Sequence, residues 1–468
     1  MSAMLPLVVD RESPRPMTVQ IQTAIRDRVL DGTLHPGSRL PSSRHLALDL
    51  GVSRSVVVQA YEQMIAEGYL RAEQGSGTRV ATHLPSRGAA DDPRPAAPPQ
   101  AVRFDLRAAA TGMALFPRRE WLLAYQNAVR SVHHSPMARP APLGVGDLRV
   151  ALASYLGRVR GVRAGGADVV VSGGTAHTLG TVCAALRDLG IDHLAVANPG
   201  DQRHVVAAAR AGARLIPVPV DAHGLDVEAL ARTGARAVLV NPVAQVPTGA
   251  ALSPTRRDAL LRWAESVDGW VIEHDPDGHL WLGRGSGPLA LQRLAPDRVV
   301  YAGSTSGMLG PCLRLGWFVA PPRLRAAIER APAGGFAEPD SLTQLAFAEF
   351  VDRGLLDQHV RQLRGTHRAR RAALRAAVAV HLPGSVVLGV EVGTHAYVPL
   401  LPGTDDVRLA ALARARSVLV DTGRQYHLDR GRAEPALVIG YGAVEHSRLA
   451  EAVAILGGLR ESRLASAG

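Results

Sequence analysis

The strongest constraint on the fold is an alternation that runs from about residue 104 to residue 460. Short runs of apolar and β-branched residues alternate there with longer stretches rich in Ala, Leu and Arg. The runs are residues 168–172, 194–197, 237–241, 269–273 and 298–302. Such an alternation is typical of a mostly parallel sheet that is covered by helices. The sequence therefore predicts an α/β body, with a smaller α+β part over roughly residues 335–460.

The first 80 residues follow a different pattern. Apolar residues recur at helical spacing, and Ser42 or Ser43 and then Ser53 stand where helix N-caps are expected. A glycine-containing turn over residues 74–77 separates two short strand candidates. The expected elements are helices over residues 19–30, 43–50 and 53–67 and strands over residues 69–72 and 78–81. Three helices followed by a hairpin predict a winged helix-turn-helix.

The two patterns are joined by residues 82–102, which hold five prolines among Ala, Ser and Asp and show no periodicity. Proline-rich segments of this kind act as spacers between domains. A chain of 468 residues is also long enough for two or three domains. We expect a head over residues 14–81, a linker over 82–103, a large domain over 104–334 and a small domain over 335–462.

The composition excludes several classes of protein. Two cysteines, Cys183 and Cys312, are too few for a disulfide framework, which fits a reducing compartment. There is no run of about 18 apolar residues and no signal-peptide pattern, so we expect a cytoplasmic protein with no membrane span. All 53 residues counted as Lys plus Arg are arginines. The chain therefore has no lysine, and no side-chain amine can form a Schiff base.

The net charge of +11 suggests a nucleic-acid ligand, but residues 1–80 carry nine arginines against eight acidic residues. A DNA-binding role for the head must therefore rest on where its side chains lie. A recognition helix presents its first turns to the major groove and its N-terminal amides to phosphate. Arg54 can contact guanine or phosphate there, and Gln59 can read adenine. The candidate DNA-binding residues are Arg39, Ser42, Arg44, Ser53, Arg54, Ser55, Gln59, Gly75, Gly77 and Thr78.

Four segments of the head resemble the GntR family of bacterial regulators. They are residues 40–44 (LPSSR), 50–54 (LGVSR), 67–70 (EGYL) and 75–78 (GSGT). The resemblance implies a transcription regulator that binds operator DNA. It also implies that Arg44, Arg54 and the wing glycine Gly77 touch that DNA.

The body resembles fold-type I aminotransferases, and the whole chain is similar to the MocR/GabR branch of the GntR family. The matching segments include residues 115–117 (LFP), 146–149 (GDLR), 172–175 (SGGT), 247–249 (PTG), 301–304 (YAGS) and 313–316 (LRLG). The resemblance implies an aminotransferase-like fold and a homodimer whose pocket lies at the subunit boundary. It also implies a site for the cofactor pyridoxal phosphate (PLP).

The residues that hold PLP in that family are largely replaced in this chain. The cofactor lysine follows a serine and lies seven residues before an arginine, but here Ser306 is followed by Gly307, and the arginine is Arg314. The aspartate that meets the pyridine nitrogen is matched by His274, and the tyrosine two positions later by Pro276.

Two further positions of the family pattern are also changed. Asp201 stands where an aromatic side chain stacks on the cofactor ring, and Val438 where an arginine takes the substrate carboxylate. Asp275 is one residue out of register with the missing aspartate and, on a strand, faces the opposite side. These losses fall on one site. With no lysine in the chain, they imply that covalent PLP is excluded and that the protein is not an enzyme.

Part of the phosphate-binding group of the family remains. Arg314, Ser304, Ser306 and Thr175 can still hold an anion, either noncovalent PLP or another effector. Alternatively, Arg314 forms only an ion pair within its own domain. His274 is either a packed polar residue or a new ligand contact. The predicted pocket residues are Thr175, Asp201, His274, Ser304, Ser306, Gly307 and Arg314.

The leading hypothesis is a sequence-specific transcription regulator whose body forms the dimer and senses an effector without PLP chemistry. The alternatives are a PLP-dependent aminotransferase or PLP-sensing regulator, and a body that serves only as a ligand-free dimerisation scaffold. No catalytic residue and no metal site are predicted. An arginine-rich run over residues 361–375 is expected on one long helix. It is either a solvated or subunit-facing surface or a second DNA contact.

Overall fold

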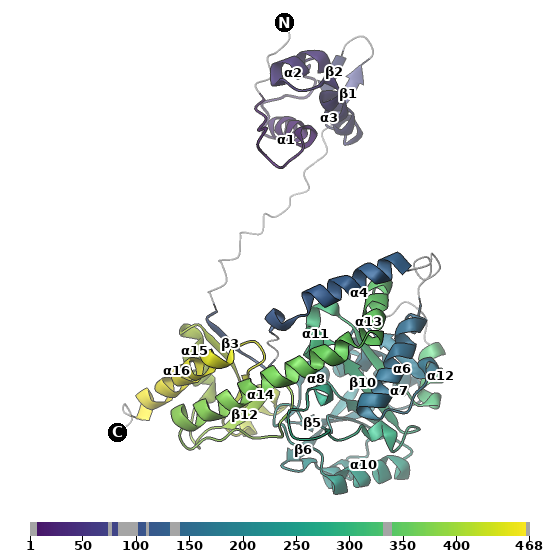
Figure 1. Cartoon of the computed structure of the whole chain (residues 1–468), viewed down its shortest axis with the longest axis vertical. Coiled ribbons are helices and arrows are strands. Elements are labelled where there is room, and N and C mark those ends of the chain that lie inside the picture. The colour runs from purple at the N-terminus through teal and green to yellow at the C-terminus, as the bar shows by residue number, and fades with distance from the viewer. Residues whose placement is uncertain are drawn as a thin grey trace. The chain divides into compact units, whose positions relative to one another are not determined.

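The computed structural model describes residues 7–73, 77–82, 102–108, 112–131, 141–330 and 339–464. The chain divides into two compact units, residues 1–99 and 100–468 (Figure 1). We call them the head and the body. Most of the predicted linker lies outside the described residues. Within these ranges, no helix has both the length and the apolar character that crossing a membrane requires.

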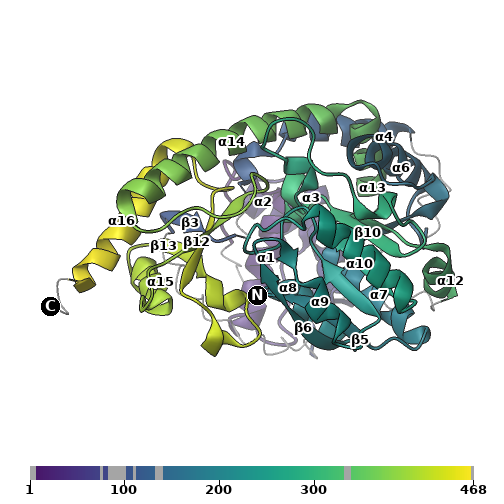
Figure 2. The same cartoon turned by 90° about the horizontal axis from the view of Figure 1, so that it is seen from below.

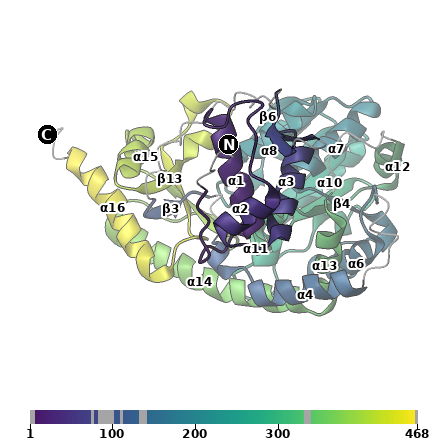
Figure 3. The ribbon, with the colours of Figure 1, turned by 90° about the horizontal axis from the view of Figure 1, so that it is seen from above.

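The head is a winged helix-turn-helix, as the sequence predicts. Its elements are α1 (Met17–Leu30), α2 (Ser43–Leu50), α3 (Arg54–Ala66), β1 (Leu70–Glu73) and β2 (Gly77–Val80), and Figure 3 shows the three helices together. Ile21 and Ile25 of α1 pack with Val57 and Met64 of α3 in one buried core. Gly51 ends α2 in the left-handed conformation with φ +63°, which a glycine adopts without strain. This glycine produces the tight turn that leads into α3.

The body is built around an eight-stranded sheet. Its strands, in spatial order, are β4 (Val169–Ser172), β11 (Gly316–Val319), β10 (Val299–Ser304), β9 (Trp270–His274), β8 (Ala237–Val240), β5 (His193–Asn198), β6 (Arg214–Asp221) and β7 (Gly224–Leu225). The pairs from β10 to β6 are parallel, whereas β11 runs antiparallel to both of its neighbours. All five predicted strands belong to this sheet, and the prediction of a mostly parallel sheet is confirmed.

Helices cover both faces of this sheet. Successive side chains of a strand point to opposite faces, so Trp317 packs into one core with α6 (Gly146–Arg160) and Phe318 into another with α7 (Thr175–Asp188). A further core lies against α9 and α10. The remaining helices of this part are α4 (Arg118–Ser131), α8 (Gln202–Arg210), α9 (Val227–Ala231), α10 (Pro254–Ser266), α11 (Ser306–Leu309), α12 (Pro322–Arg330) and α13 (Ser341–Asp352).

A second, four-stranded sheet forms the smaller part of the body. Its spatial order is β12 (His395–Pro399), β14 (Ala436–Gly440), β13 (Val418–Thr422) and β3 (Phe104–Leu106). Three helices accompany this sheet, α14 (Leu355–His381), α15 (Asp406–Ala415) and α16 (His446–Leu464). The long helix α14 extends from α13 to α16, so that it joins the two parts of the body (Figure 2).

Both predicted domain boundaries within the body are wrong in detail. Residues 104–106 were expected in the large domain, but β3 pairs in parallel with β13 of the small sheet. The boundary at residue 334 also differs, because Phe347 and Phe350 of α13 and Val360 of α14 pack in the core of the large part. Pairing across some 300 residues of sequence leaves no local signal, since a three-residue strand is identified only by its partner.

The arginine-rich run does lie on one helix, and only part of it is a solvated surface, since Arg361, Arg368 and Arg375 are exposed. Arg370 and Arg371 of α14 are buried and donate to the backbone carbonyls of Gly442 and Gly389. Arg364 and Arg368 donate to the carbonyls of residues 279 and 282 at 2.8 and 2.9 Å. These guanidinium groups therefore tie loops of the body to α14.

Candidate functional site

The candidate DNA-binding residues of the head gather at the start of α2, at the start of α3 and at the wing. Ser42 caps α2, and its Oγ accepts a hydrogen bond from the backbone N–H of His45 at 3.2 Å. Arg44 lies in the first turn of α2 and Arg54 is the first residue of α3; both are exposed. The two arginines therefore stand at helix N-termini, where phosphate is favoured.

Ser53 occupies the N-cap position of α3, but its side chain does not cap the helix. Its Oγ lies 2.8 Å from the Oγ of Ser55 instead. Both serines and Gln59 are exposed. The start of α3 therefore presents two hydroxyl groups and a carboxamide to a ligand, in addition to the guanidinium of Arg54.

Arg39 precedes α2 by four residues and lies beside the wing. It forms an isolated β-bridge with Arg79 of β2. A Cβ atom added to Gly77 would lie 3.4 Å from Nε of Arg39, and Gly77 has φ +91°, which favours glycine. Thr78 follows on β2 and is partly exposed, whereas Gly75 lies outside the described residues. Arg39 therefore lies on the same surface as Gly77 and Thr78 of the wing.

The arginines of this face are not neutralised by the protein. The ion pairs of the described head join Arg26 to Glu67 and both Arg71 and Arg79 to Glu73. Within the described residues, none involves Arg39, Arg44 or Arg54. The head is nearly neutral overall, but its unpaired positive charge lies where a DNA backbone is expected.

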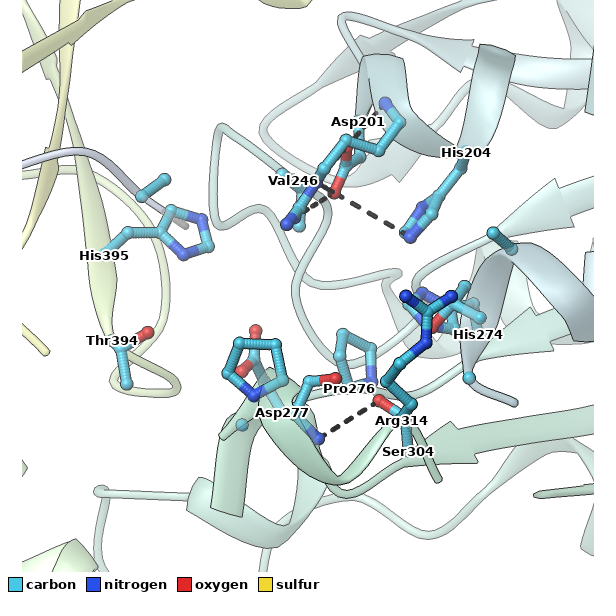
Figure 4. Close-up of a pocket in the computed structure, with 18 of the residues that line it drawn as sticks. Asp201, His204, Val246, His274, Pro276, Asp277, Ser304, Arg314, Thr394 and His395 are labelled. Carbon is cyan, nitrogen blue, oxygen red and sulfur yellow. Dashed lines mark hydrogen bonds and ion pairs between the residues drawn. The ribbon is translucent and has the colours of Figure 1, made fainter. Parts of the chain in front are cut away.

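In the body, all seven predicted pocket residues line one cavity of about 330 Å³ (Figure 4). The cavity lies beyond the carboxyl ends of β4, β5, β9 and β10, the place where α/β sheets bind ligands. The seven are Thr175, Asp201, His274, Ser304, Ser306, Gly307 and Arg314. Thr394, His395 and Tyr426 line the cavity from the smaller part of the body, and sequence reasoning missed them.

One wall of the cavity suits an anion. Arg314 is exposed, adopts a left-handed backbone conformation with φ 47°, and forms no ion pair within the described ranges. This geometry disagrees with the alternative that Arg314 serves only in an internal ion pair. Ser304, at the end of β10, and Ser306, at the start of α11, lie nearby, with the Ser304 Oγ 3.4 Å from the backbone nitrogen of Ser306. Thr175, at the N-terminus of α7, completes this group.

His274 is held as a neutral imidazole with both nitrogens engaged. Asn241 Nδ2 lies 2.9 Å from the backbone oxygen of His274 and 3.1 Å from its Nδ1. Because a carbonyl oxygen only accepts, this Asn241 atom is the donor nitrogen, and Nδ1 therefore accepts. The proton then sits on Nε2 and is donated to Thr175 Oγ1 at 3.1 Å. Burial and the neighbouring His204 lower the pKa of His274 well below its usual value. This arrangement favours the packed role over a ligand contact.

Asp201 is fixed by its own helix and is not free to contact a cofactor ring. Its carboxylate accepts from the backbone N–H of Arg203 as the N-cap of α8 and forms an ion pair with the Arg203 side chain at 2.6 Å. His204 Nε2 lies 3.8 Å from the same carboxylate. Burial opposes ionisation of Asp201, but His204 and Arg203 outweigh it and lower the pKa.

Asp275 faces away from the cavity, as its register predicts. Its Oδ2 accepts from Arg160 Nε at 2.7 Å and from the Tyr301 hydroxyl at 2.9 Å, and its Oδ1 from the Gly278 N–H at 2.9 Å. Arg160 and Asp275 are both buried. This carboxylate is therefore part of a core ion pair and is not available to a ligand in the cavity.

Asp277 is a further carboxyl group in the cavity wall. Burial, with a smaller effect of Asp275, raises the pKa of Asp277 to about 6. Burial also lowers the pKa of another lining residue, His395, to about 4. In the part of the chain that the structure describes, no group of three or more His, Cys, Asp or Glu is placed to hold a metal ion.

Two family models match the chain, one for each unit. Residues 17–80 match the model described as bacterial regulatory proteins, gntR family. Residues 137–456 match the model described as aminotransferase class I and II.

Similar curated proteins share both units. The probable rhizopine catabolism regulatory protein MocR of Rhizobium meliloti is 32% identical over 397 residues, which is 80% of each chain. The pyridoxine biosynthesis transcriptional regulator PdxR of Corynebacterium glutamicum is 31% identical over 457 residues, covering 96% of this chain and 97% of its own.

Solved structures similar to the body are aminotransferases. The kynurenine aminotransferase of Pyrococcus horikoshii has a TM-score of 0.70 at 22% identity, covering 78% of this chain and 92% of its own. A multiple substrate aminotransferase of Thermococcus profundus has a TM-score of 0.71 at 21% identity, covering 78% and 93%. At this level of identity, the likeness concerns the fold alone.

Proposed function

Because the chain belongs to the MocR-type branch of the GntR family, and so is a DNA-binding transcription regulator, we propose that its body responds to a noncovalently bound anionic effector. The observation that carries the proposal is the cavity at the carboxyl edge of the sheet. It keeps Arg314, an arginine with no ion pair among the described residues, but lacks the groups that would hold PLP covalently. The body is proposed to catalyse no transamination.

Three features of the cavity argue against PLP as a resident cofactor. The chain has no lysine, and position 307 is a glycine. His274 has no free nitrogen for a pyridine ring, because Asn241 and Thr175 engage both of its nitrogens. Asp201 offers no aromatic face, and its carboxylate is held by α8. A pyridine nitrogen without a carboxylate partner makes PLP a poor electron sink. The residues present therefore do not fit the cofactor.

The alternatives differ in what binds the cavity. An aminotransferase, or a regulator that senses PLP covalently, requires an aldimine, whereas a pure scaffold binds nothing. A thermal-shift screen with small anions separates the effector hypothesis from the scaffold. A ligand present at 100 times its Kd adds about 2.7 kcal/mol to stability. Loss of that shift in Arg314→Ala assigns it to the cavity.

The head is proposed to contact DNA through the face that Arg39, Arg44 and Arg54 define. Arg54→Ala is expected to weaken operator binding by about 1–3 kcal/mol if the side chain reads a base. If the side chain contacts only phosphate, the affinities for random DNA and for operator DNA fall by the same factor. The slope of the logarithm of the binding constant against the logarithm of the salt concentration then becomes shallower by about one unit. Fluorescence anisotropy at several salt concentrations distinguishes the two.

Arg28→Ala provides the matched control, because it removes the same charge from α1, away from the start of α3. Its operator affinity is expected to stay close to that of the parent protein. Unchanged affinity and salt slope in Arg54→Ala, on operator and on random DNA alike, would remove Arg54 from the interface.

The protein is proposed to act as a homodimer, since the family builds its pocket at a subunit boundary. Two heads on proline-rich tethers then read two half-sites. Light scattering at micromolar concentration is expected to give about twice the chain mass of 49.4 kDa. A monomer mass at that concentration would contradict the proposal.

A further inference from the structure

A second cavity, of about 280 Å³, lies in the smaller part of the body. It is enclosed by the loop after β12, by α15 and by the C-terminal part of α16, and it shares no lining residue with the cavity around Arg314. Its lining combines an apolar group with two cations. The apolar side chains are Leu401, Leu409, Leu412 and Leu459, and the cations are Arg408 and Arg460.

Arg460 is an unusual lining residue because its guanidinium is buried but only partly satisfied. The residue is 8% exposed, and Nη2 donates to the backbone oxygen of Pro383 at 2.9 Å. Nε and Nη1 have no hydrogen-bond partner among the described residues. A buried guanidinium is normally satisfied on all sides, and a carboxylate is the partner that matches its fork. Arg460 therefore brings to the wall of the cavity a positive charge that the described residues satisfy only in part, although Nε and Nη1 themselves are buried.

The rest of the lining sets the shape of an anionic ligand. Arg408 is exposed in the first turn of α15, and the one acidic residue of the lining, Asp405, already uses Oδ1 to accept the backbone N–H of Arg408. The lining thus carries one net positive charge. Leu409 is buried, and Leu412 is partly buried beside it. A ligand here needs one negative group and an apolar body, and the volume limits it to on the order of ten heavy atoms.

We propose that this cavity binds a small amphipathic carboxylate. The carboxylate is held by Arg408 and Arg460, and the hydrocarbon part lies against the four leucines. Such a ligand contacts both α15 and α16 and so stabilises the packing of these two helices in the smaller part of the body. The site is separate from the proposed effector cavity, and neither proposal depends on the other.

Octanoate is the probe, and it is tested on the full-length protein by calorimetric titration below its micellar concentration. It is expected to bind at least tenfold more tightly than acetate, which lacks the tail, and than 1-octanol, which lacks the charge. Arg460→Gln is expected to weaken octanoate at least tenfold. Leu401→Trp, at a lining position that is 41% exposed, fills the cavity without disturbing the core and is expected to abolish binding.

Two controls locate the site. Leu294→Trp changes an exposed leucine elsewhere on the body, and Arg314→Ala empties the other cavity of its arginine. Both are expected to bind octanoate as the parent does. Equal affinity for octanoate and 1-octanol overturns the proposal, because apolar contact alone then explains binding. Absence of octanoate binding, unchanged binding in Leu401→Trp, or loss of binding in Arg314→Ala also overturns it.

Discussion

Replacing Arg160 by methionine is expected to destabilise the body by about 3–5 kcal/mol, because it leaves the buried carboxylate of Asp275 without its cation. Arg160 and Asp275 have side chains that are 2% and 0% exposed and lie 2.7 Å apart. Tyr301 and the Gly278 N–H still bond to Asp275 in the variant, but neither supplies a charge. All five tryptophans lie in the body. Urea unfolding followed by tryptophan fluorescence therefore reports on the body alone.

A double-mutant cycle separates the ion pair from the loss of packing. Asp275→Asn is expected to be destabilising on its own, since it leaves a buried guanidinium. The combination of Arg160→Met with Asp275→Asn is expected to cost less than the sum of the two, because no unpaired charge then remains. A single Arg160→Met variant that loses less than about 1 kcal/mol would show that water or another group compensates for the carboxylate. Circular dichroism should confirm that the parent fold is kept.

The architecture of the chain could be predicted because it depends on local patterns. Strands such as β4 and β9 are buried on both faces, so they appear in the sequence as short apolar runs. Ser42 and Gly51 mark the two ends of α2 by capping chemistry that is local. The edges of the domains could not be predicted. β3 is three residues long and has no strand signal until β13 lies beside it.

The candidate cavity could be predicted in part. Motif positions brought Thr175, Ser304 and Arg314 together, because the end of β4, the end of β10 and the start of the antiparallel strand β11 lie at the same edge of the sheet. His395 and Tyr426 have no such motif, and they reach the cavity only because the smaller part of the body closes over it. The role of Asn241 was also missed. It directly follows β8, but only the neighbouring strand β9 shows that it fixes the tautomer of His274.

Purified protein is expected to show no visible aldimine band, even after incubation with excess PLP, and no pyridoxyl adduct after borohydride reduction. An internal aldimine needs a side-chain amine, and this chain has no lysine. The primary amine that remains is that of the N-terminus, which belongs to the head. Absorbance spectroscopy and intact mass after reduction measure the result. A reduced adduct in the body would contradict the proposed function.

Restoring the lysine alone is expected not to restore transamination. In Gly307→Lys, the new Cβ lies about 3.1 Å from the backbone oxygen of Pro276, which is tight but within reach of a small shift. A PLP ring near this lysine would still meet His274, whose two nitrogens are bonded to Asn241 and Thr175. The new lysine can form an aldimine with PLP and so colour the protein. Without a carboxylate at the pyridine nitrogen, however, the bound PLP is a poor electron sink and does not catalyse transamination.

Absorbance and turnover therefore give separate answers for Gly307→Lys. A visible band with no conversion of amino acid to keto acid is the expected outcome, and Gly287→Lys, which places a lysine outside the cavity, is the control that should give neither. Turnover by the single variant would mean that His274 moves aside and that another group meets the ring nitrogen. The cavity would then be a cofactor site that has lost only its lysine, and the proposal of an effector held by Arg314 without PLP would fall.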